Sequence, residues 1–223
     1  MTSQEVKDKI FNKFCIIDER SHTLLSPFIV SREKKVLYWH IAKTGGSSID
    51  FLLKKNNLND NVLDNINLTF EERKSYFRDV VDNWDEYSKF TFIRNKYDQL
   101  VSLYHYDRFA SLQNCSFEEF IKNHINQKSS FYPNYHYWID QHFLTTIDNV
   151  NIFNFIGRFE NYQNDLKKVC SDIGIPFENV RKNLGTYNKS KNYTSYYTPE
   201  LKSIVDHHFK QEIEYFNWRH LNE

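Results

Sequence analysis

Three short apolar runs divide the chain, and each leads into a stretch in which apolar residues recur at helical spacing. The runs cover residues 36–41, 90–93 and 151–156, and they are rich in the aromatic and β-branched residues that favour strands. After the first run, Ile49 and Leu52 begin the spacing of an amphipathic helix. Strands that alternate with helices predict βα units and a parallel sheet. We therefore expect an α/β fold.

Polar residues mark where further helices start. Thr69, Ser116 and Thr198 each stand directly before a helical pattern, and both residue types are favoured N-caps. Pro199 takes the first helical position after Thr198, which suits its fixed backbone angle. We expect helices at residues 5–14, 47–56, 70–77, around 100–104, 117–125, 133–144, around 166–173 and 199–216. The approach to the first strand, between residues 14 and 36, and residues 56–68 are expected to be irregular.

Length and charge narrow the class of protein. The 223 residues fit one domain, 1–223, in which residues 1–35 form an N-terminal extension. Lys plus Arg and Asp plus Glu both number 29, so bulk charge gives no reason to expect nucleic acid or an anionic membrane as a partner. The three cysteines match neither a disulfide framework nor a zinc site. No apolar run reaches the length of a membrane span, and we expect a cytoplasmic protein without a signal peptide.

The turn after the first apolar run carries the first candidate site, Lys43-Thr44-Gly45-Gly46-Ser47-Ser48. Adjacent glycines let backbone N–H groups approach a ligand closely. Ser47 or Ser48 is expected to cap the following helix, whose free N–H groups favour an anion. Lys43 adds a positive charge, so the turn predicts a cradle for phosphate or sulfate. Because the lysine precedes the glycines, this is not a Walker-type loop.

The second candidate site follows the second run. Arg94 stands at the carboxyl end of the strand, where open α/β sheets bind ligands. Ser102 lies about two turns into the next helix, and helical side chains lean toward the helix N-terminus. We therefore expect Ser102 and the Arg94 guanidinium to share one anion. The alternative is that Arg94 caps a helix or pairs with Asp98.

These segments, taken in order, resemble the signatures of one enzyme family. His-Ile-Ala-Lys-Thr-Gly-Gly-Ser-Ser resembles H-I-P-K-T-G-G-T-S, and residues 90–104 resemble F-x-F-V-R-N-P-Y-D-R-L-V-S-x-Y. Residues 156–161 resemble I-G-R-F-E-N, and the segment from Asn188 to Leu201 resembles an N-x-S…Y-Y-T-P-E-L tail. The family is the PAPS-dependent sulfotransferases of the carbohydrate type, related to the heparan 2-O- and chondroitin enzymes and their bacterial relatives. Three departures stand out, since Ala42 and Lys96 replace prolines and Gln99 replaces an arginine.

The resemblance implies a P-loop-like three-layer sandwich with a central parallel sheet flanked by helices. It also implies that PAPS is the sulfate donor, that PAP is the product and that no metal is needed. The residues from Lys43 to Ser48 would hold the 5′-phosphosulfate, and Arg94 and Ser102 would hold the 3′-phosphate. Candidate contacts from a closing loop are Lys189, Ser190 and Tyr193. Residues 105–150 form a helical insertion where we expect the acceptor, a glycan or a small molecule.

The catalytic base is not given by the resemblance. Many family members carry a histidine in an H-x-[ST]-A segment, but the counterpart here begins at Asn67, whose amide is not a base at neutral pH. Glu71, His105 or His136 would have to take the proton, with Asp79 and His142 as further candidates, while Lys43 neutralises charge on the leaving oxygen. The expected function is sulfuryl transfer from PAPS to a hydroxyl, with a carbohydrate as the expected acceptor. The alternatives are a non-catalytic module that binds PAP and a nucleotide phosphotransferase.

Overall fold

A computed structural model describes residues 3–21, 28–60, 68–105, 115–126, 140–180 and 192–220 of the chain. In this part of the chain the central sheet has the strand order β1-β2-β3-β6. The strands are β1 (Phe28–Ser31), β2 (Val36–Trp39), β3 (Ser88–Ile93) and β6 (Phe155–Arg158). β2, β3 and β6 are parallel, whereas β1 is antiparallel to β2. The central sheet is therefore mostly parallel, as the sequence predicts.

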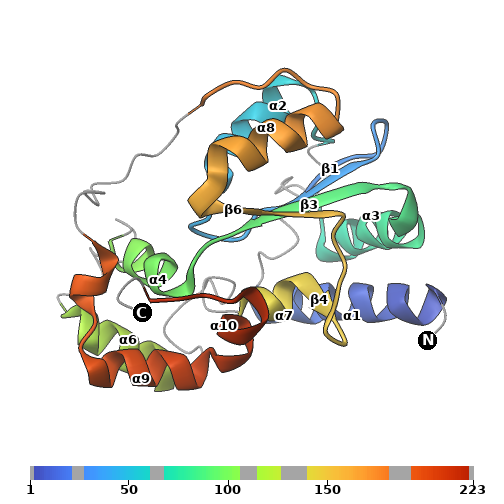
Figure 1. Cartoon of the computed structure of the whole chain (residues 1–223). Helices are drawn as coiled ribbons and strands as arrows, with labels where there is room; N and C mark the ends of the chain where they lie inside the picture. The colour runs from blue at the N-terminus through green and yellow to red at the C-terminus, as the bar shows by residue number, and fades with distance from the viewer. Residues whose placement is uncertain are drawn as a thin grey trace.

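Helices cover both faces of the sheet (Figure 1). Along β2, Val36 and Tyr38 pack with α2 (Gly46–Lys55) and α8 (Tyr162–Asp172). Leu37 and Trp39 point to the other face, where α1 (Ser3–Ser21) and α3 (Phe70–Asp82) pack. This alternation follows from the two-residue period of a strand. The three-layer α/β sandwich expected from the sequence is confirmed.

A third group of elements lies at one end of the sheet, on the left in Figure 1. It contains α4 (Lys96–Tyr104), α6 (Phe117–Asn126) and α9 (Pro199–His208), which share a hydrophobic core with the short η4 (Tyr193–Tyr196). Because β2, β3 and β6 are parallel, their carboxyl ends face this same end of the sheet. The loops that leave those ends are the ones that carry the candidate motifs.

Smaller elements complete the described chain. α7 (Gln141–Thr145) leads into a hairpin of β4 (Thr146–Ile147) and β5 (Val150–Asn151). α10 (Lys210–Phe216) follows α9 and packs against α7. Two short 3₁₀ turns, η1 (Trp84–Glu86) and η3 (Phe159–Asn161), precede β3 and α8. In the described ranges, no helix combines the length and the apolar character needed to cross a membrane.

The predicted caps are largely confirmed. The Thr69 hydroxyl accepts a hydrogen bond from the N–H of Glu72 in a capping box, and Thr198 caps α9 with Pro199 at the first turn. The Ser116 hydroxyl accepts from the N–H of Glu119 in the same way at the start of α6. The prediction for α2 is wrong, because its N-cap is Gly45 and no side chain caps it. Ser47 and Ser48 lie inside the first turn instead.

Several predicted boundaries are also wrong. Residues 28–31, expected to be irregular, form β1, whose four residues are buried on both faces of the sheet. The helix expected over 133–144 is confirmed for residues 141–144, in α7, but it does not continue back through Asp140, which is a non-helical N-cap; the residues before 140 lie outside the described part of the chain. The third strand begins at Phe155 and not at residue 151. The expected final helix breaks at Phe209, which ends α9 and caps α10.

Candidate functional site

The turn from β2 into α2 is shaped by its backbone. Lys43 has φ +66° and Gly45 has φ +88°, so two residues of the turn adopt the left-handed conformation. Gly45 tolerates this at no steric cost, whereas a left-handed lysine is uncommon and points to a functional constraint. The Thr44 side chain is fully buried, and its hydroxyl donates to the carbonyl oxygen of Ile41 at 2.7 Å. Thr44 therefore fixes the turn through its hydroxyl.

Both glycines of this turn lie under an aromatic ring. A Cβ on Gly46 would stand 2.1 Å from the His40 imidazole, and one on Gly45 would stand 2.7 Å from the Tyr162 ring. The Tyr162 hydroxyl donates to the carbonyl oxygen of Gly45 at 3.0 Å, and burial raises the pKa of Tyr162 to about 12, so this donor stays protonated. The start of α2 is therefore held close to the strand end, with its first N–H groups uncapped by a side chain. Such a helix start favours an anion.

The Arg94 guanidinium joins the second motif to the first. Its Nη1 donates to the carbonyl oxygen of Lys43 at 2.9 Å, and its Nε pairs with Asp98 Oδ2 at 2.7 Å. The guanidinium also lies over the Phe159 ring, 4.1 Å from the ring centroid. The expected alternative, pairing with Asp98, is thus present. Since these contacts use two of the five N–H donors of an arginine, the fork can still bind an oxyanion.

The accessible face of α4 carries Asp98 and Ser102. Between Thr91 and Leu103, these are the two positions that are not buried. They are four residues apart in the helix, and residues at that spacing share one helix face. Arg94 precedes the helix, whose N-cap is Asn95, and its largely buried guanidinium meets this face through its bond to Asp98. This arrangement agrees with a ligand that runs along that face.

Two side chains, those of Gln141 and Glu160, fix the backbone next to the guanidinium. Gln141 accepts from the Arg94 N–H at 2.9 Å and donates to the Arg94 carbonyl at 2.8 Å. Glu160 accepts from the N–H of Asn95 at 2.6 Å. The Asn95 amide and the Tyr193 hydroxyl both donate to the carbonyl oxygen of Arg219, at 2.9 Å and 3.4 Å. Tyr193 is thereby connected to the second motif through a shared acceptor.

The candidate bases have different surroundings. His105 follows the end of α4, about 14 Å along the helix axis from Lys96, and its Nε2 lies 2.7 Å from the Tyr196 hydroxyl. Glu71 is exposed in the first turn of α3. His136, Lys189 and Ser190, which the sequence also proposes for the site, lie outside the described residues. Within the described ranges, no group of three or more His, Cys, Asp and Glu side chains is placed to hold a metal ion.

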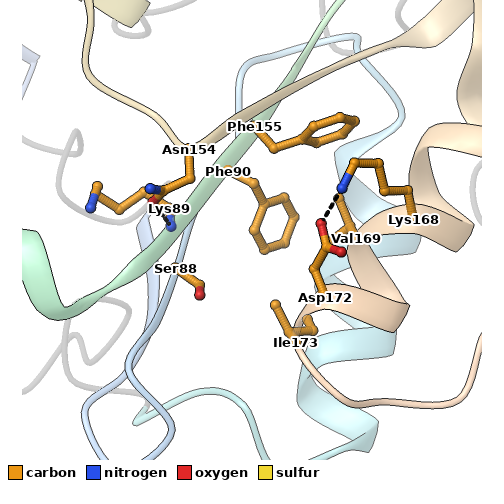
Figure 2. Close-up of a pocket in the computed structure, with 9 residues that line it drawn as sticks. All are labelled: Ser88, Lys89, Phe90, Asn154, Phe155, Lys168, Val169, Asp172 and Ile173. Carbon is orange, nitrogen blue, oxygen red and sulfur yellow. Dashed lines mark hydrogen bonds and ion pairs between the residues drawn. The ribbon is translucent and has the colours of Figure 1, made fainter.

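A cavity at the opposite edge of the sheet is not part of this site (Figure 2). It measures about 150 Å³ and is lined by the rings of Phe90 and Phe155, with the ion pair of Lys168 and Asp172 beside them. Ser88, also in its wall, is the first residue of β3, and Phe155 is the first of β6. The cavity therefore lies at the amino ends of the strands, whereas Lys43 and Arg94 follow carboxyl ends.

Fold and motifs together define an α/β protein with a candidate anion site at the carboxyl edge of a mostly parallel sheet. Residues 26–219 match a model described as Sulfotransferase family, and the chain belongs to that family. The carbohydrate-type resemblance of the motifs is consistent with this assignment. The chain is also 35% identical, over 97 residues, to an uncharacterized protein of Archaeoglobus fulgidus, a match that covers 43% of this chain and 74% of that protein. No solved structure matches the chain significantly.

Sequence reasoning missed several residues of the site. It assigned no site role to residues 156–161, yet Phe159 stacks on the Arg94 guanidinium and Glu160 holds the neighbouring backbone. It also missed Tyr162, which contacts Gly45 from a helix far along the chain. The ordered resemblance of all four segments was the available signal, because segments that recur together in one order are expected to meet in space.

Gly46→Ala tests the close packing at the start of α2. The added methyl would displace the His40 ring or the helix start, so we expect a loss of about 1–3 kcal/mol in the free energy of unfolding and a tenfold or greater loss of affinity for adenosine 3′,5′-bisphosphate. Gly174→Ala is the control, since Gly174 has φ +70° and open space around it. It should cost roughly 1 kcal/mol through backbone strain with unchanged affinity. Chemical denaturation and calorimetry measure both, and equal losses of affinity would contradict the role of Gly46.

Proposed function

We propose that this protein transfers a sulfuryl group from PAPS to a hydroxyl acceptor, with a carbohydrate as the acceptor class. The observation that carries the proposal is the 2.9 Å hydrogen bond from Arg94 Nη1 to the carbonyl oxygen of Lys43. It joins two strand ends that each carry an anion motif. A donor with phosphate groups at both its 3′ and 5′ positions has the two charged ends that such a pair requires.

The residues present fit such a donor. The start of α2, uncapped and free of Cβ atoms at Gly45 and Gly46, would receive the 5′-phosphosulfate together with Lys43, Ser47 and Ser48. The remaining guanidinium N–H groups of Arg94 and the hydroxyl of Ser102 would hold the 3′-phosphate. Tyr193, with Lys189 and Ser190, is proposed for the same nucleotide. These assignments follow the family resemblance and the contacts described above.

In the proposed reaction these residues mostly position the donor and the acceptor and stabilise the charge that develops during transfer. In the transfer, the acceptor oxygen forms a bond to sulfur as the bond from sulfur to the bridging 5′-phosphate oxygen breaks. Lys43 would neutralise the negative charge that develops on that bridging oxygen. The hydroxyl proton would pass to a base, for which Glu71, His105 and His136 are the candidates.

The proposal is tested by incubating the purified protein with sulfur-labelled PAPS and a panel of glycans. We expect label in the glycan fraction and release of adenosine 3′,5′-bisphosphate without added metal. Tight binding of the bisphosphate without transfer to any acceptor would support the non-catalytic alternative. Magnesium-dependent transfer from ATP in place of PAPS would support the phosphotransferase alternative, and either result would overturn the proposal.

Once an acceptor is known, a pH–rate profile assigns the base. The profile of kcat is measured for Glu71→Gln, His105→Gln and His136→Gln. The base is the residue whose replacement removes the fall of kcat at low pH while the affinity for PAP is retained. For His105 a matched variant is Tyr196→Phe, which removes the hydroxyl that contacts its imidazole. A shift of the profile in Tyr196→Phe would link this hydrogen bond to the base. An unchanged profile in all three base variants would exclude these candidates.

A further inference from the structure

A buried ion pair lies behind the site. Lys96, in the first turn of α4, and Glu212, in α10, are almost completely inaccessible to solvent, and Lys96 Nζ lies 3.0 Å from Glu212 Oε2. Buried pairs of this kind add little net stability compared with an apolar pair, because removing both charges from water is costly. Stability alone therefore does not account for this pair, and the hydrogen bonds around it indicate another role.

One arm of the cluster leads to Arg94. The Glu212 carboxylate accepts from the backbone N–H of Gln141 and, at 2.6 Å, from its side-chain amide. The same Gln141 amide bonds both the N–H and the carbonyl of Arg94, at 2.9 Å and 2.8 Å. The orientation of the amide is thus fixed by Glu212, and the backbone of Arg94 is fixed by the amide.

The other arm leads to the turn that carries Lys43. Lys96 Nζ donates to the Gln99 side-chain oxygen at 2.8 Å, and the Gln99 amide donates to the carbonyl oxygen of Ala42 at 2.9 Å. Ala42 directly precedes Lys43. Lys96 and Gln99 are also the two positions of the second motif at which this chain departs from the proline and arginine of the family pattern. Their contacts show that the two departures act as one connected unit.

We infer that Glu212 and Lys96 are positioning residues, which hold the Arg94 strand end and the Lys43 turn at the spacing that a doubly phosphorylated nucleotide requires. This inference rests on the proposed function, since it concerns the same site. Neither residue contacts the ligand in this account. Each acts through a glutamine, Gln141 or Gln99, on the backbone of the neighbouring motif.

The double variant Lys96→Met/Glu212→Leu tests the inference. It replaces the buried charges with apolar groups of similar size, so the fold should be retained, whereas either single change would leave one buried charge without its partner. Both glutamines lose the groups that orient them, and we expect a tenfold or greater loss of affinity for adenosine 3′,5′-bisphosphate, with kcat for transfer reduced less than KM is raised. Lys168→Met/Asp172→Leu, which removes a surface pair on α8, is the control and should leave affinity unchanged.

The pH dependence of the affinity for the bisphosphate distinguishes a positioning role of Glu212 from a role in packing alone. The pKa of Glu212 is raised to about 7, mainly because the carboxyl is buried. The positive charge of Lys96 lowers this pKa, and the negative charge of Asp140, at the start of α7, raises it further. His208 in α9 also faces Lys96. As pH falls through about 7, protonation of Glu212 weakens its bonds to Gln141 and Lys96, so affinity should fall faster in the wild type than in the double variant. Protonation of the ligand's own phosphates changes its affinity for both proteins equally, so it cancels in the ratio of the wild-type affinity to that of the double variant.

The outcomes separate the two proposals. If the wild type does not bind the bisphosphate, the proposed function fails. If the wild type binds it and the folded double variant binds it equally well with the same pH profile, the function stands and the positioning role is wrong. If the double variant does not fold, Gln141→Leu and Gln99→Leu test the two arms separately, and unchanged affinity in both would overturn the inference.

Discussion

Lys43→Ala is expected to lower the rate of sulfuryl transfer by about 10²–10³-fold, the effect typical of removing one group that stabilises transition-state charge. The loss should fall on kcat, because the charge on the leaving oxygen develops during the reaction. The protein should stay folded, since the contact from Arg94 is made to the Lys43 backbone and not to its side chain. Initial rates with labelled PAPS, together with a thermal melt, measure both quantities.

Lys54→Ala is the control for this experiment. Lys54 lies in α2, the helix that follows the Lys43 turn, is exposed and pairs loosely with Asp50 at 3.6 Å. Exposed pairs of this kind contribute about 0–1 kcal/mol, so rate and stability should both be close to the wild type. A Lys43→Ala protein with an unchanged rate would remove Lys43 from the mechanism.

Arg94→Ala is expected to weaken the binding of adenosine 3′,5′-bisphosphate by about 10²–10⁴-fold, because two charge-assisted hydrogen bonds of about 1.5–3 kcal/mol each are lost. It should also lower the free energy of unfolding, since the same guanidinium contacts Asp98, the Lys43 carbonyl and the Phe159 ring. Calorimetry gives the affinity and chemical denaturation gives the stability.

Arg158→Ala separates these two effects. Arg158 ends the neighbouring strand β6, directly beside Ile93, and it too donates to a backbone carbonyl, that of Phe216, and stacks on an aromatic ring, that of Trp218. Its removal should lower stability by a comparable amount and leave affinity unchanged. Equal losses of affinity in the two variants would show that Arg94 acts through stability alone.

The sequence predicted the βα units and the strand ends that carry the candidate site, because both follow from local patterns. The runs before Lys43 and Arg94 read as strands, and parallel strands bring their carboxyl ends to one edge. The sequence also predicted the N-caps Thr69, Ser116 and Thr198. Each of these hydroxyls accepts a hydrogen bond from the backbone N–H three residues further along the chain, so the cap depends on local sequence.

What the sequence did not predict depends on contacts between distant segments. Phe28–Ser31 reads as a short apolar stretch, and its pairing with β2 is set by a hairpin that the residues before Val36 did not reveal. In the sequence, nothing distinguishes Lys96 from an exposed helical lysine. Its burial depends on the ion pair with Glu212, which lies more than a hundred residues later in the chain. The cap of α2 was assigned to a serine because serines are common caps, but the rings of His40 and Tyr162 lie where only glycines fit.

The central claim is that two strand ends hold opposite ends of one nucleotide, and calorimetry with three ligands tests it most directly. Adenosine 3′,5′-bisphosphate, 5′-AMP and 3′-AMP are titrated into the wild type and into Arg94→Ala. We predict that the wild type binds the bisphosphate more tightly than either monophosphate, and that Arg94→Ala reduces its affinity to that of 5′-AMP without changing the affinity for 5′-AMP itself. Equal weakening of the bisphosphate and 5′-AMP, or a wild type that binds all three alike, would contradict the account.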